Sequence, residues 1–395
     1  MIYLRGGQVL RGRLTNVQSI HWERKRDDIS HAKVVLDGFD DHLLSLLQET
    51  HALTHELVIF REANGVQERV WEGPITLIQD EYDTWTIEAD DVMQYLARRI
   101  IRQGYNDGFQ LVGGVIVPGG IVGGVQIGLR SVVERCERTI INALAYDDPN
   151  LLPFLTAIKN PNDAPQTRVV PDYARMVHED LDDLAANGGL DYTVVGRRIV
   201  LWDTHRPIGK LPELRNQSFS APPRITEYGK QFCNHYGVTD GSGVHGVAQR
   251  GIDPSTRRPL LGTGWVEMLA TAYGVDTDEV ADASTLTAAK RAELEATYAK
   301  QAERNIAHRW PLVYQVRLPD NTRLMPEVEV GINQLTPGVW IPLRAKSRVR
   351  DIAQWQKLDQ VTVDQDAGGE VIKVTMSPAP NGGSDPDAEN AALED

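Results

Sequence analysis

The sequence predicts a β-rich α+β protein in which two tube-like β-barrel domains flank a small α/β domain. Three observations support this fold class. A run of strand patterns closed by a helix pattern occupies residues 57–101, and a similar run occupies residues 339–376. Between them lie two helix patterns and a tight hairpin, followed by a long Ala- and Glu-rich helix inserted in the second barrel region.

The first run begins with Leu57–Arg61, a β-branched and aromatic strand pattern, and continues through Arg69–Ile78 and Thr84–Glu88. Pro74 interrupts the middle strand pattern, and because proline cannot donate a ladder hydrogen bond it predicts a bend or an edge there. Asp90 is in position to cap a following helix. The apolar residues of that helix recur at every fourth position, at Val92, Leu96 and Ile100.

The second run repeats this order. Trp340–Leu343 predicts a strand, Asp351–Lys357 a loop or a short helical turn, and the pair Gln360–Asp364 and Val371–Met376 a hairpin over an acidic, glycine-containing turn. Aligned without gaps, ITLIQD at position 75 and VTVDQD at position 361 share Thr, Gln and Asp. The matching order of elements predicts two related barrels.

The remaining chain divides by composition and pattern. We expect a first barrel domain over 1–105, a glycine-rich loop over 106–130, a small α/β domain over 131–221, a second barrel domain over 222–378 with a helical insertion over 284–308, and a disordered acidic tail over 379–395. Residues 1–13 predict an extended arm that either adds to a neighbour's sheet or frays. Residues 327–332 predict a further strand.

Two helices and a hairpin define the small domain. Ser131 followed by Glu134 predicts a capping box, and Cys136 lies on the apolar stripe of that helix as a small core residue. Asp172–Asn187 predicts the second helix, and a hairpin turns near Gly196. The segment Gly104–Leu129 is either a protrusion that touches a partner or a membrane, or a glycine-rich ribbon beside the barrel. We favour the ribbon, because glycines offer no side chain for recognition.

Composition excludes several functions. The formal net charge of −14 argues against a protein that binds nucleic acid through its phosphate groups. The two cysteines, Cys136 and Cys233, are too few for a disulfide scaffold or a cysteine-based zinc site and are typical of a chain made in a reducing cytoplasm. No stretch has the pattern of a signal peptide or a transmembrane helix.

No catalytic, cofactor-binding or metal site is predicted. His51 and His55 have the spacing of a zinc pair on a helix, but Ala52 replaces the glutamate of the metalloprotease motif. Neither cysteine has a catalytic signature around it. The carboxylate pairs Glu179-Asp180 and Asp182-Asp183 predict the solvated face of a helix rather than a glycosidase dyad. The eight tryptophans are spread over the chain and predict core or interface anchors.

The order of segments resembles a known family. It runs through VWEGPITLIQ, a helix ending in ARRI, DLDDLAANGGLDYTVVGRRIVLW, the long Ala/Glu helix before Pro311, LTPGVWIPL and VIKVTMSPAP. This order resembles the minor tail proteins of long-tailed phages of actinobacteria, the tail-hub family, which are similar in plan to the baseplate hub of contractile phages. The resemblance spans about residues 15–378.

The resemblance implies a structural role with no enzymatic site. Two tube-like barrels per chain in a homotrimer would form a pseudo-hexameric ring that closes the tail tube at the tip of the virion. Its implied partners are tail-tube or distal tail proteins, other tail-tip or fibre proteins, and the tape-measure protein, with DNA only in transit. An acidic lumen suits this passage because it repels phosphate. Two other functions remain open: a receptor- or carbohydrate-binding tail-tip protein, and a cell-wall hydrolase.

Overall fold

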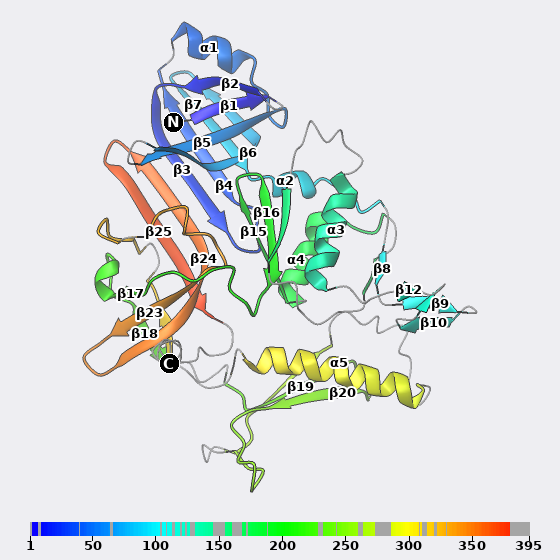
Figure 1. The fold of residues 1–395 in the computed structure, drawn as a ribbon. Coiled ribbons are helices and arrows are strands. Elements are labelled where there is room, and N and C mark those ends of the chain that lie inside the picture. The colour runs from blue at the N-terminus through cyan, green and yellow to red at the C-terminus, as the bar shows by residue number, and fades with distance from the viewer. Residues whose placement is uncertain are drawn as a thin grey trace.

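The computed structural model describes residues 2–6, 9–38, 40–63, 66–102, 131–144, 173–187, 189–227, 232–241, 243–259, 264–272, 286–307, 309, 314–319, 322–328 and 330–379, together with short strands between 105 and 170. These residues form one large mixed sheet, several small sheets and five α-helices (Figure 1). The prediction of a β-rich α+β protein is therefore confirmed.

One sheet of eleven strands dominates the molecule. Its strands are β1 Ile2–Gly6, β2 Val9–Leu14, β3 Val17–Lys25, β4 His31–Asp37, β5 His55–Ala63, β6 Val66–Glu81, β7 Thr84–Asp90, β17 Leu214–Arg215, β23 Trp340–Lys346, β24 Asp351–Asp366 and β25 Gly369–Pro378. Their order is β17-β23-β24-β3-β4-β7-β6-β5-β1-β2, and β25 pairs with β24.

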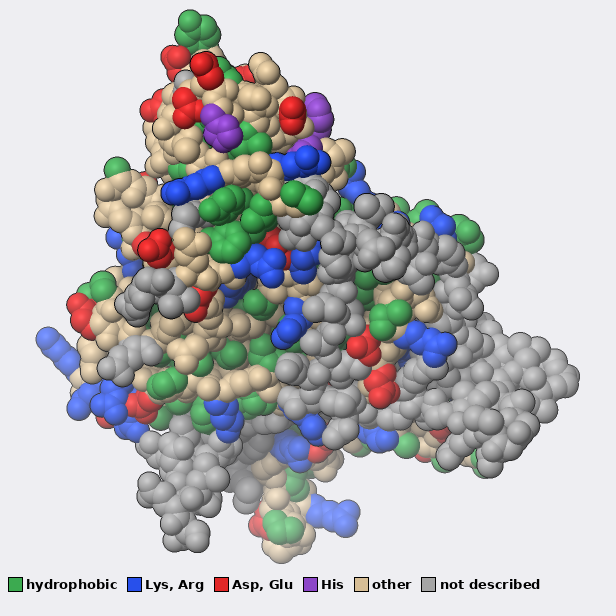
Figure 2. All heavy atoms as spheres, turned by 45° about the horizontal axis from the view of Figure 1, so that its top comes forward, with side chains coloured by type: hydrophobic (Ala, Val, Ile, Leu, Met, Phe, Trp, Pro, Cys, Tyr) green, Lys and Arg blue, Asp and Glu red, His purple; other side chains and the backbone are tan. Residues whose placement is uncertain are grey.

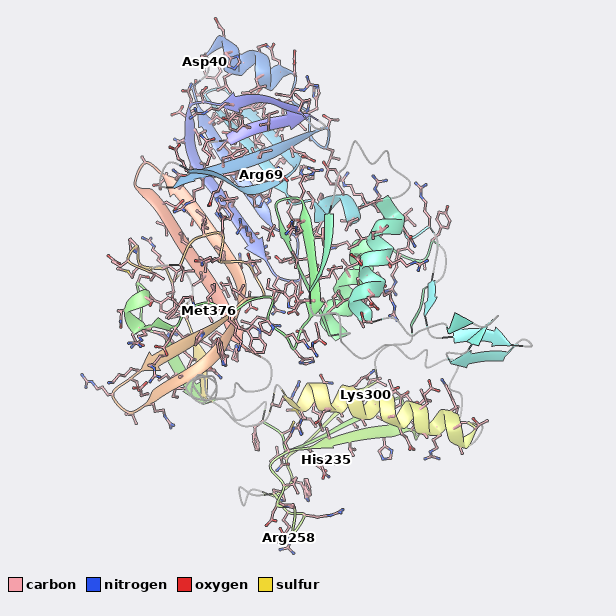
Figure 3. All side chains as sticks on the ribbon, in the orientation of Figure 1. Asp40, Arg69, His235, Arg258, Lys300 and Met376 are labelled. Atoms are coloured by element: carbon pink, nitrogen blue, oxygen red, sulfur yellow. The ribbon has the colours of Figure 1, made fainter. Side chains whose placement is uncertain are left out.

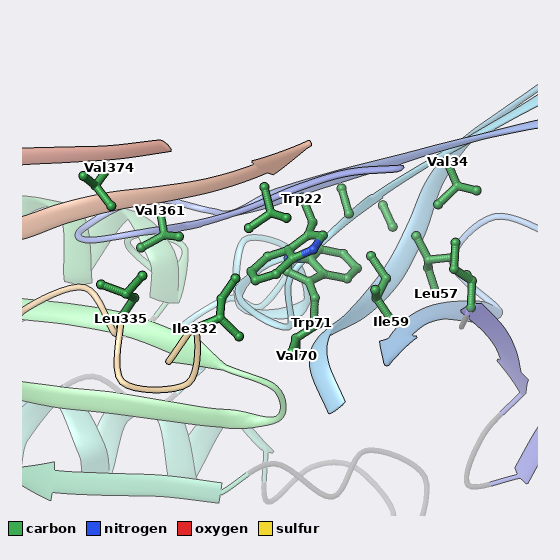
Figure 4. Packing of buried hydrophobic residues seen from close by; sticks show 14 of the residues in the cluster. Trp22, Val34, Leu57, Ile59, Val70, Trp71, Ile332, Leu335, Val361 and Val374 are labelled. Atoms are coloured by element: carbon green, nitrogen blue, oxygen red, sulfur yellow. The ribbon is translucent and has the colours of Figure 1, made fainter. Parts of the chain in front are cut away.

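Two separate closed barrels do not form within the described residues. The reason is the pairing of β3, which bonds to β4 along one edge and to β24 along the other. Strands from the two ends of the chain therefore continue one sheet instead of curling into two. The hydrophobic core follows the same path, because residues such as Trp22 and Ile59 share one cluster with Ile332 and Val361 (Figure 4).

The repeated order of elements predicted from the sequence corresponds to two three-stranded meanders, β5-β6-β7 and β23-β24-β25. Each has a middle strand of 16 residues that pairs with the preceding strand along its first part and with the following strand along its second. The expected loop or helical turn at Asp351–Lys357 is wrong. Those seven residues pair one by one with Trp340–Lys346 and form the first part of β24.

A close backbone approach fixes the bend in β6. Pro74 is the last residue of β6 in register with β5, and Ile75 is the first in register with β7, so the predicted bend at Pro74 coincides with a change of partner. A Cβ on Gly73 would lie 1.9 Å from the carbonyl oxygen of Asp90. Only glycine lets the two backbones come so close.

The N-terminal segment is not a free arm. β1 and β2 form a hairpin, and β1 pairs with β5, so residues 2–14 extend the chain's own sheet. Helix α1 (Asp41–Gln48) lies at this end, and Asp40 caps it, because Asp40 Oδ1 accepts a hydrogen bond of 2.7 Å from the Leu43 amide.

The small α/β unit has a separate core. It contains α2 Met93–Leu96, α3 Val132–Leu144, α4 Val177–Asn187, β13 Leu155–Lys159, β15 Leu190–Val195 and β16 Arg198–Asp203. Cys136 is fully buried in this core, as expected. The capping box is confirmed, because Ser131 Oγ accepts from the Glu134 amide and Glu134 Oε2 accepts from the Ser131 amide, both at 3.1 Å.

Two helices of this unit are shorter than predicted. The helix expected from Asp90 to Ile100 reduces to α2, and Ile100 instead forms a bridge with Met176. The helix expected over Asp172–Asn187 begins at Val177, because Glu179 Oε2 accepts from the Met176 amide and caps the chain there.

The predicted glycine-rich loop contains short strands. These are β8 Tyr105–Asp107, β9 Phe109–Val112, β10 Val115–Pro118, β11 Ile121–Val122 and β12 Val125–Gln126. β9 pairs with β10, β11 pairs with β12, and β8 pairs with β14 (Arg168–Val170). This arrangement is a ribbon. The glycine pairs at 113–114, 119–120 and 123–124 lie outside the described residues.

A third unit places a helix on a small sheet. It consists of α5 Ala288–Ala307 over β19 His235–Thr239, β20 His245–Gln249 and β21 Glu267–Thr271. β18 Arg224–Glu227 pairs with β22 Tyr314–Arg317. This pair and the 3-10 helix Asn216–Ser218 lie against the large sheet, because Phe219, Ile225 and Val316 pack in its core. Sequence patterns missed β21, and the strand expected over 327–332 is wrong, because the Val328 amide bonds to the Met325 carbonyl in a turn.

Candidate functional site

The small α/β unit is joined to the large sheet by a partly buried ion cluster, which consists of Arg26, Asp27, Asp191, Lys357 and Asp359. Arg26 Nη1 lies 2.6 Å from Asp27 Oδ2 and 3.0 Å from Asp191 Oδ1. Arg26 Nη2 lies 2.8 Å from Asp359 Oδ1. Lys357 Nζ lies 2.5 Å from Asp191 Oδ2. The cluster thus connects three segments that are remote in sequence.

Burial and charge set the protonation of this cluster. The side chains of Asp191 and Lys357 are 1% and 4% exposed. Burial, together with the neighbouring Asp191 charge, raises the pKa of Asp27 to about 8, although Arg26 opposes the shift. Burial acts to raise the pKa of Asp191 too, but Lys357 and Arg26 outweigh it and the pKa is lowered. Two cations, Arg26 and Lys357, thus lie among three carboxyl groups, and the raised pKa of Asp27 favours its protonated form more than in an exposed aspartate.

Backbone bonds reinforce the cluster. Asp27 and Tyr192 exchange hydrogen bonds, since the Asp27 amide donates to the Tyr192 carbonyl at 2.9 Å and Asp27 Oδ1 accepts from the Tyr192 amide at 2.8 Å. Asp27 has a φ of 57°, in the left-handed region that aspartate tolerates better than most residues. Lys357 Nζ also donates to the carbonyl oxygen of Thr204 at 2.8 Å. These contacts make the cluster a joint between the small α/β unit and the large sheet.

A second ion pair joins the same two parts of the molecule. Arg197, in the β15–β16 turn, places Nη1 2.6 Å from Glu56 Oε2 on β5. Tyr95 of α2 donates its hydroxyl to Glu56 Oε1 at 2.8 Å. Both charged side chains are buried, at 9% and 6% exposure, so breaking the pair would leave a charge without compensation.

A cavity of about 410 Å³ lies beside this pair, lined by Arg69, Val195, Gly196, Arg197, Arg198, Val200, Ile208, Thr336 and Val339. Figure 3 shows Arg69 on the sheet beside the small α/β unit. Arg69 Nη1 lies 3.1 Å from Glu72, so the cavity wall is partly neutralised. Among these lining residues Thr336 carries the one hydroxyl group, and that hydroxyl donates to the Asn333 carbonyl oxygen at 3.4 Å.

Trp202 packs against Gly338 in the loop that precedes β23. It is fully buried, and a Cβ on Gly338 would lie 2.2 Å from its ring. Gly338 has a φ of 96°, in the left-handed region that favours glycine, and the Trp202 ring leaves no room for a Cβ. Both features require glycine at this position.

The residues weighed for chemistry are not brought together. His51 and His55 lie in a turn and at the start of β5, with ring centroids 6.3 Å apart. His55 Nδ1 accepts from the His51 amide at 3.1 Å. Cys136 and Cys233 are buried in different cores. No group of three metal-ligating side chains occurs in the part of the chain that the structure describes.

The acidic face of α4 is less solvated than expected. Asp180 is fully buried and lies 3.5 Å from Arg175, which also pairs with Asp183 at 2.9 Å. Asp182 accepts a hydrogen bond of 2.5 Å from the Tyr192 hydroxyl. Glu179 is exposed at the helix start, and the Asp182 side chain is 45% exposed. These carboxylates hold the unit together.

The tryptophans divide into core and surface positions. Trp22, Trp71, Trp202 and Trp355 are buried, while Trp265 is 44% exposed. Trp85 and Trp340 are partly buried, and Trp310 lies outside the described residues.

Among the described helices, none has the length and apolar composition needed to span a membrane.

Comparison with known proteins gives a fold relationship. No family model and no curated protein matches the sequence. Among solved structures, the chain is similar to a 43 kDa prophage tail protein from Shewanella oneidensis, with a TM-score of 0.55 and 12% identity over 98% of this chain and 99% of that one.

Two further structures agree. A tail protein from Neisseria meningitidis gives a TM-score of 0.55 at 10% identity over 96% of this chain and 97% of that one. The prophage tail protein gp18 from Listeria monocytogenes gives 0.52 at 11% identity over 100% and 98%. From end to end, this chain has the fold of these phage tail proteins.

Proposed function

We propose that this chain is a structural, non-enzymatic phage tail protein that acts as the hub at the tail tip. The observation that carries the proposal is the whole-length similarity to three tail proteins. Because both chains of each pair are covered almost completely, the similarity is not that of one shared module. The joint described above adds rigidity, which a structural role requires.

The finer proposal is a trimeric, pseudo-hexameric ring. Each chain carries two meanders of the same plan, so three chains supply six similar positions that can face a hexameric tube. In the ring, neighbouring chains would cover the sheet edges that a single chain leaves open. Residues 1–105, 131–221 and 222–378 would be the domains of each chain. The tape-measure protein and DNA would pass through its channel.

Labelling of virions tests the location. A gold-conjugated antibody against this protein should mark the distal end of the tail of the phage that carries it. Labelling along the tail shaft or on the capsid would contradict the hub role. On a zymogram with host cell walls the protein should produce no lytic band, and on a glycan array it should bind no glycan. A lytic band that survives repurification would favour the hydrolase, and a glycan hit the receptor-binding function.

A further inference from the structure

Exposed acidic side chains gather at one end of the large sheet. They come from the end of β4, the start of α1 and the β6–β7 hairpin, namely Asp37, Asp40, Asp41, Asp80, Glu81 and Asp83. Within the described residues none of these carboxylates has an ion-pair partner. Tyr82, at the tip of the β6–β7 hairpin, is 98% exposed. We call this surface the acidic end.

The β23–β24 hairpin carries the opposite charge at its turn. The turn Lys346–Arg350 holds three cations and no carboxylate, and Val349 within it is 87% exposed. Ser347 orders the turn, because its amide donates to the Arg350 carbonyl at 2.7 Å and its Oγ accepts from the Arg350 amide at 3.0 Å. Lys346 and Arg348 have no ion-pair partner in the described chain. We call this turn the basic tip.

The strand register places these two surfaces at opposite ends of one sheet. β24 runs from the basic tip toward Asp366, and β3 and β4 alternate direction beside it. β4 therefore ends at Asp37 on the far side, where Asp37 pairs with Thr84 next to the β6–β7 turn. Figure 2 shows red side chains gathered at the end that carries α1 and blue side chains at the lower left, where Figure 1 places the β23–β24 hairpin.

We propose that the basic tip of one copy of this chain docks on the acidic end of a second copy. Each surface combines charges of one sign with one exposed apolar side chain, Val349 or Tyr82, so the contact would gain both charge complementarity and apolar burial. A second copy is the occupant that fits, because the same chain carries both halves.

The contact is heterologous, since different surfaces of the two copies meet. Such contacts generate a closed ring when the rotation between copies closes, and an open filament when it does not. The proposal deepens the hub function and rests on it only for ring closure. For a ring, the strands must run obliquely around the channel, so that one end of each sheet reaches the opposite end of the next.

Disulfide trapping tests the contact on the full-length protein. Tyr82→Cys and Val349→Cys variants, mixed and oxidised at low salt, should give a mixed cross-linked dimer in preference to either homodimer. The native cysteines do not interfere, because Cys136 and Cys233 are fully buried. A matched control replaces Tyr82→Cys by Tyr173→Cys, since Tyr173 is 67% exposed but belongs to neither surface.

Charge reversal gives the second readout. Arg348→Glu added to the Val349→Cys variant, or Glu81→Lys added to the Tyr82→Cys variant, should slow cross-linking several-fold, and mixing the two reversed variants should restore it. Cross-linking at the control rate, or equal rates in all charge combinations, would overturn the proposal and point to another protein as the occupant. Virion labelling is independent of this result, so either proposal can fail without the other.

Discussion

Gly246 of β20 lies directly against the backbone of Ala299 in α5, so close that a Cβ on Gly246 would be 2.0 Å from the Ala299 nitrogen. This approach brings the helix down onto its sheet and lets Tyr298, which is fully buried, fill the core between them. The hydroxyl of Tyr298 then reaches Asp240 Oδ2 at 2.9 Å. The packing of the helix-on-sheet unit depends on this one missing side chain.

Gly246→Ala should therefore destabilise that unit. Overpacking of a tight contact costs about 1–3 kcal/mol, and here the neighbouring atoms are backbone and cannot rotate away. Urea denaturation followed by circular dichroism measures the loss. Gly331→Ala is the control, because Gly331 is exposed and an added Cβ meets only the Gln334 side chain, at 3.6 Å. Equal effects of the two substitutions would contradict the packing.

Lys357→Met should cost more than a surface charge. Leaving a buried charge without any partner costs about 3–5 kcal/mol. Asp191 is 1% exposed and would keep only Arg26, at 3.0 Å, as a cation, so the loss should lie at or below the lower end of that range. Lys373→Met is the matched control, because Lys373 pairs with the more exposed Asp364 at 2.8 Å and its loss should cost below about 1 kcal/mol. The difference between the two midpoints in denaturant measures the strength of the joint.

The ion cluster should also make stability depend on pH. The pKa of Asp27 is raised to about 8 in the folded chain, against an ordinary value near ~3.9 in the unfolded chain. The folded state therefore binds more protons between these values, and this residue's contribution to stability falls as pH rises from about 4 to 8.

Asp27→Asn removes that titration. Asparagine tolerates the left-handed φ of this position and keeps an oxygen for the Tyr192 amide. The variant should gain stability relative to the wild-type protein as pH is raised from 5 to 8.5. Denaturation midpoints at several pH values provide the measurement. A difference between the two proteins that does not change with pH would show that Asp27 is ionised throughout.

A cut after Ala379 should leave the folding midpoint nearly unchanged. The predicted tail began at Ala379, but that residue is 4% exposed and its amide donates to the Trp355 carbonyl at 2.9 Å. A chain that ends at residue 379 keeps this contact, whereas one that ends at Pro378 loses it. Scanning calorimetry of the two truncations should show a lower transition temperature only for the shorter chain.

Much of the fold follows from local pattern. Strands with clear alternation and the Ser131 capping box are where the sequence places them, because each depends on neighbouring residues. The 16-residue length of β24 does not follow in the same way. Its first part alternates poorly, and its strand conformation depends on pairing with β23.

The joint could not be predicted. Arg26, Asp191 and Lys357 stand at strand ends or within strands where charged residues are ordinary, and nothing local distinguishes a buried ion pair from a solvated one. The union of two meanders in one sheet is likewise set by the pairing of β3 with β24, across more than 300 residues of sequence. A pattern confined to either meander carries no information about that pairing.

Reconstruction of the virion tail tip without imposed symmetry tests the central claim most directly. The hub account predicts three copies of this chain in one ring, with the β5-β6-β7 and β23-β24-β25 meanders alternating around the channel in six similar positions. Six copies in the ring, or a position on the outside of the tube with no part in the channel wall, would contradict it.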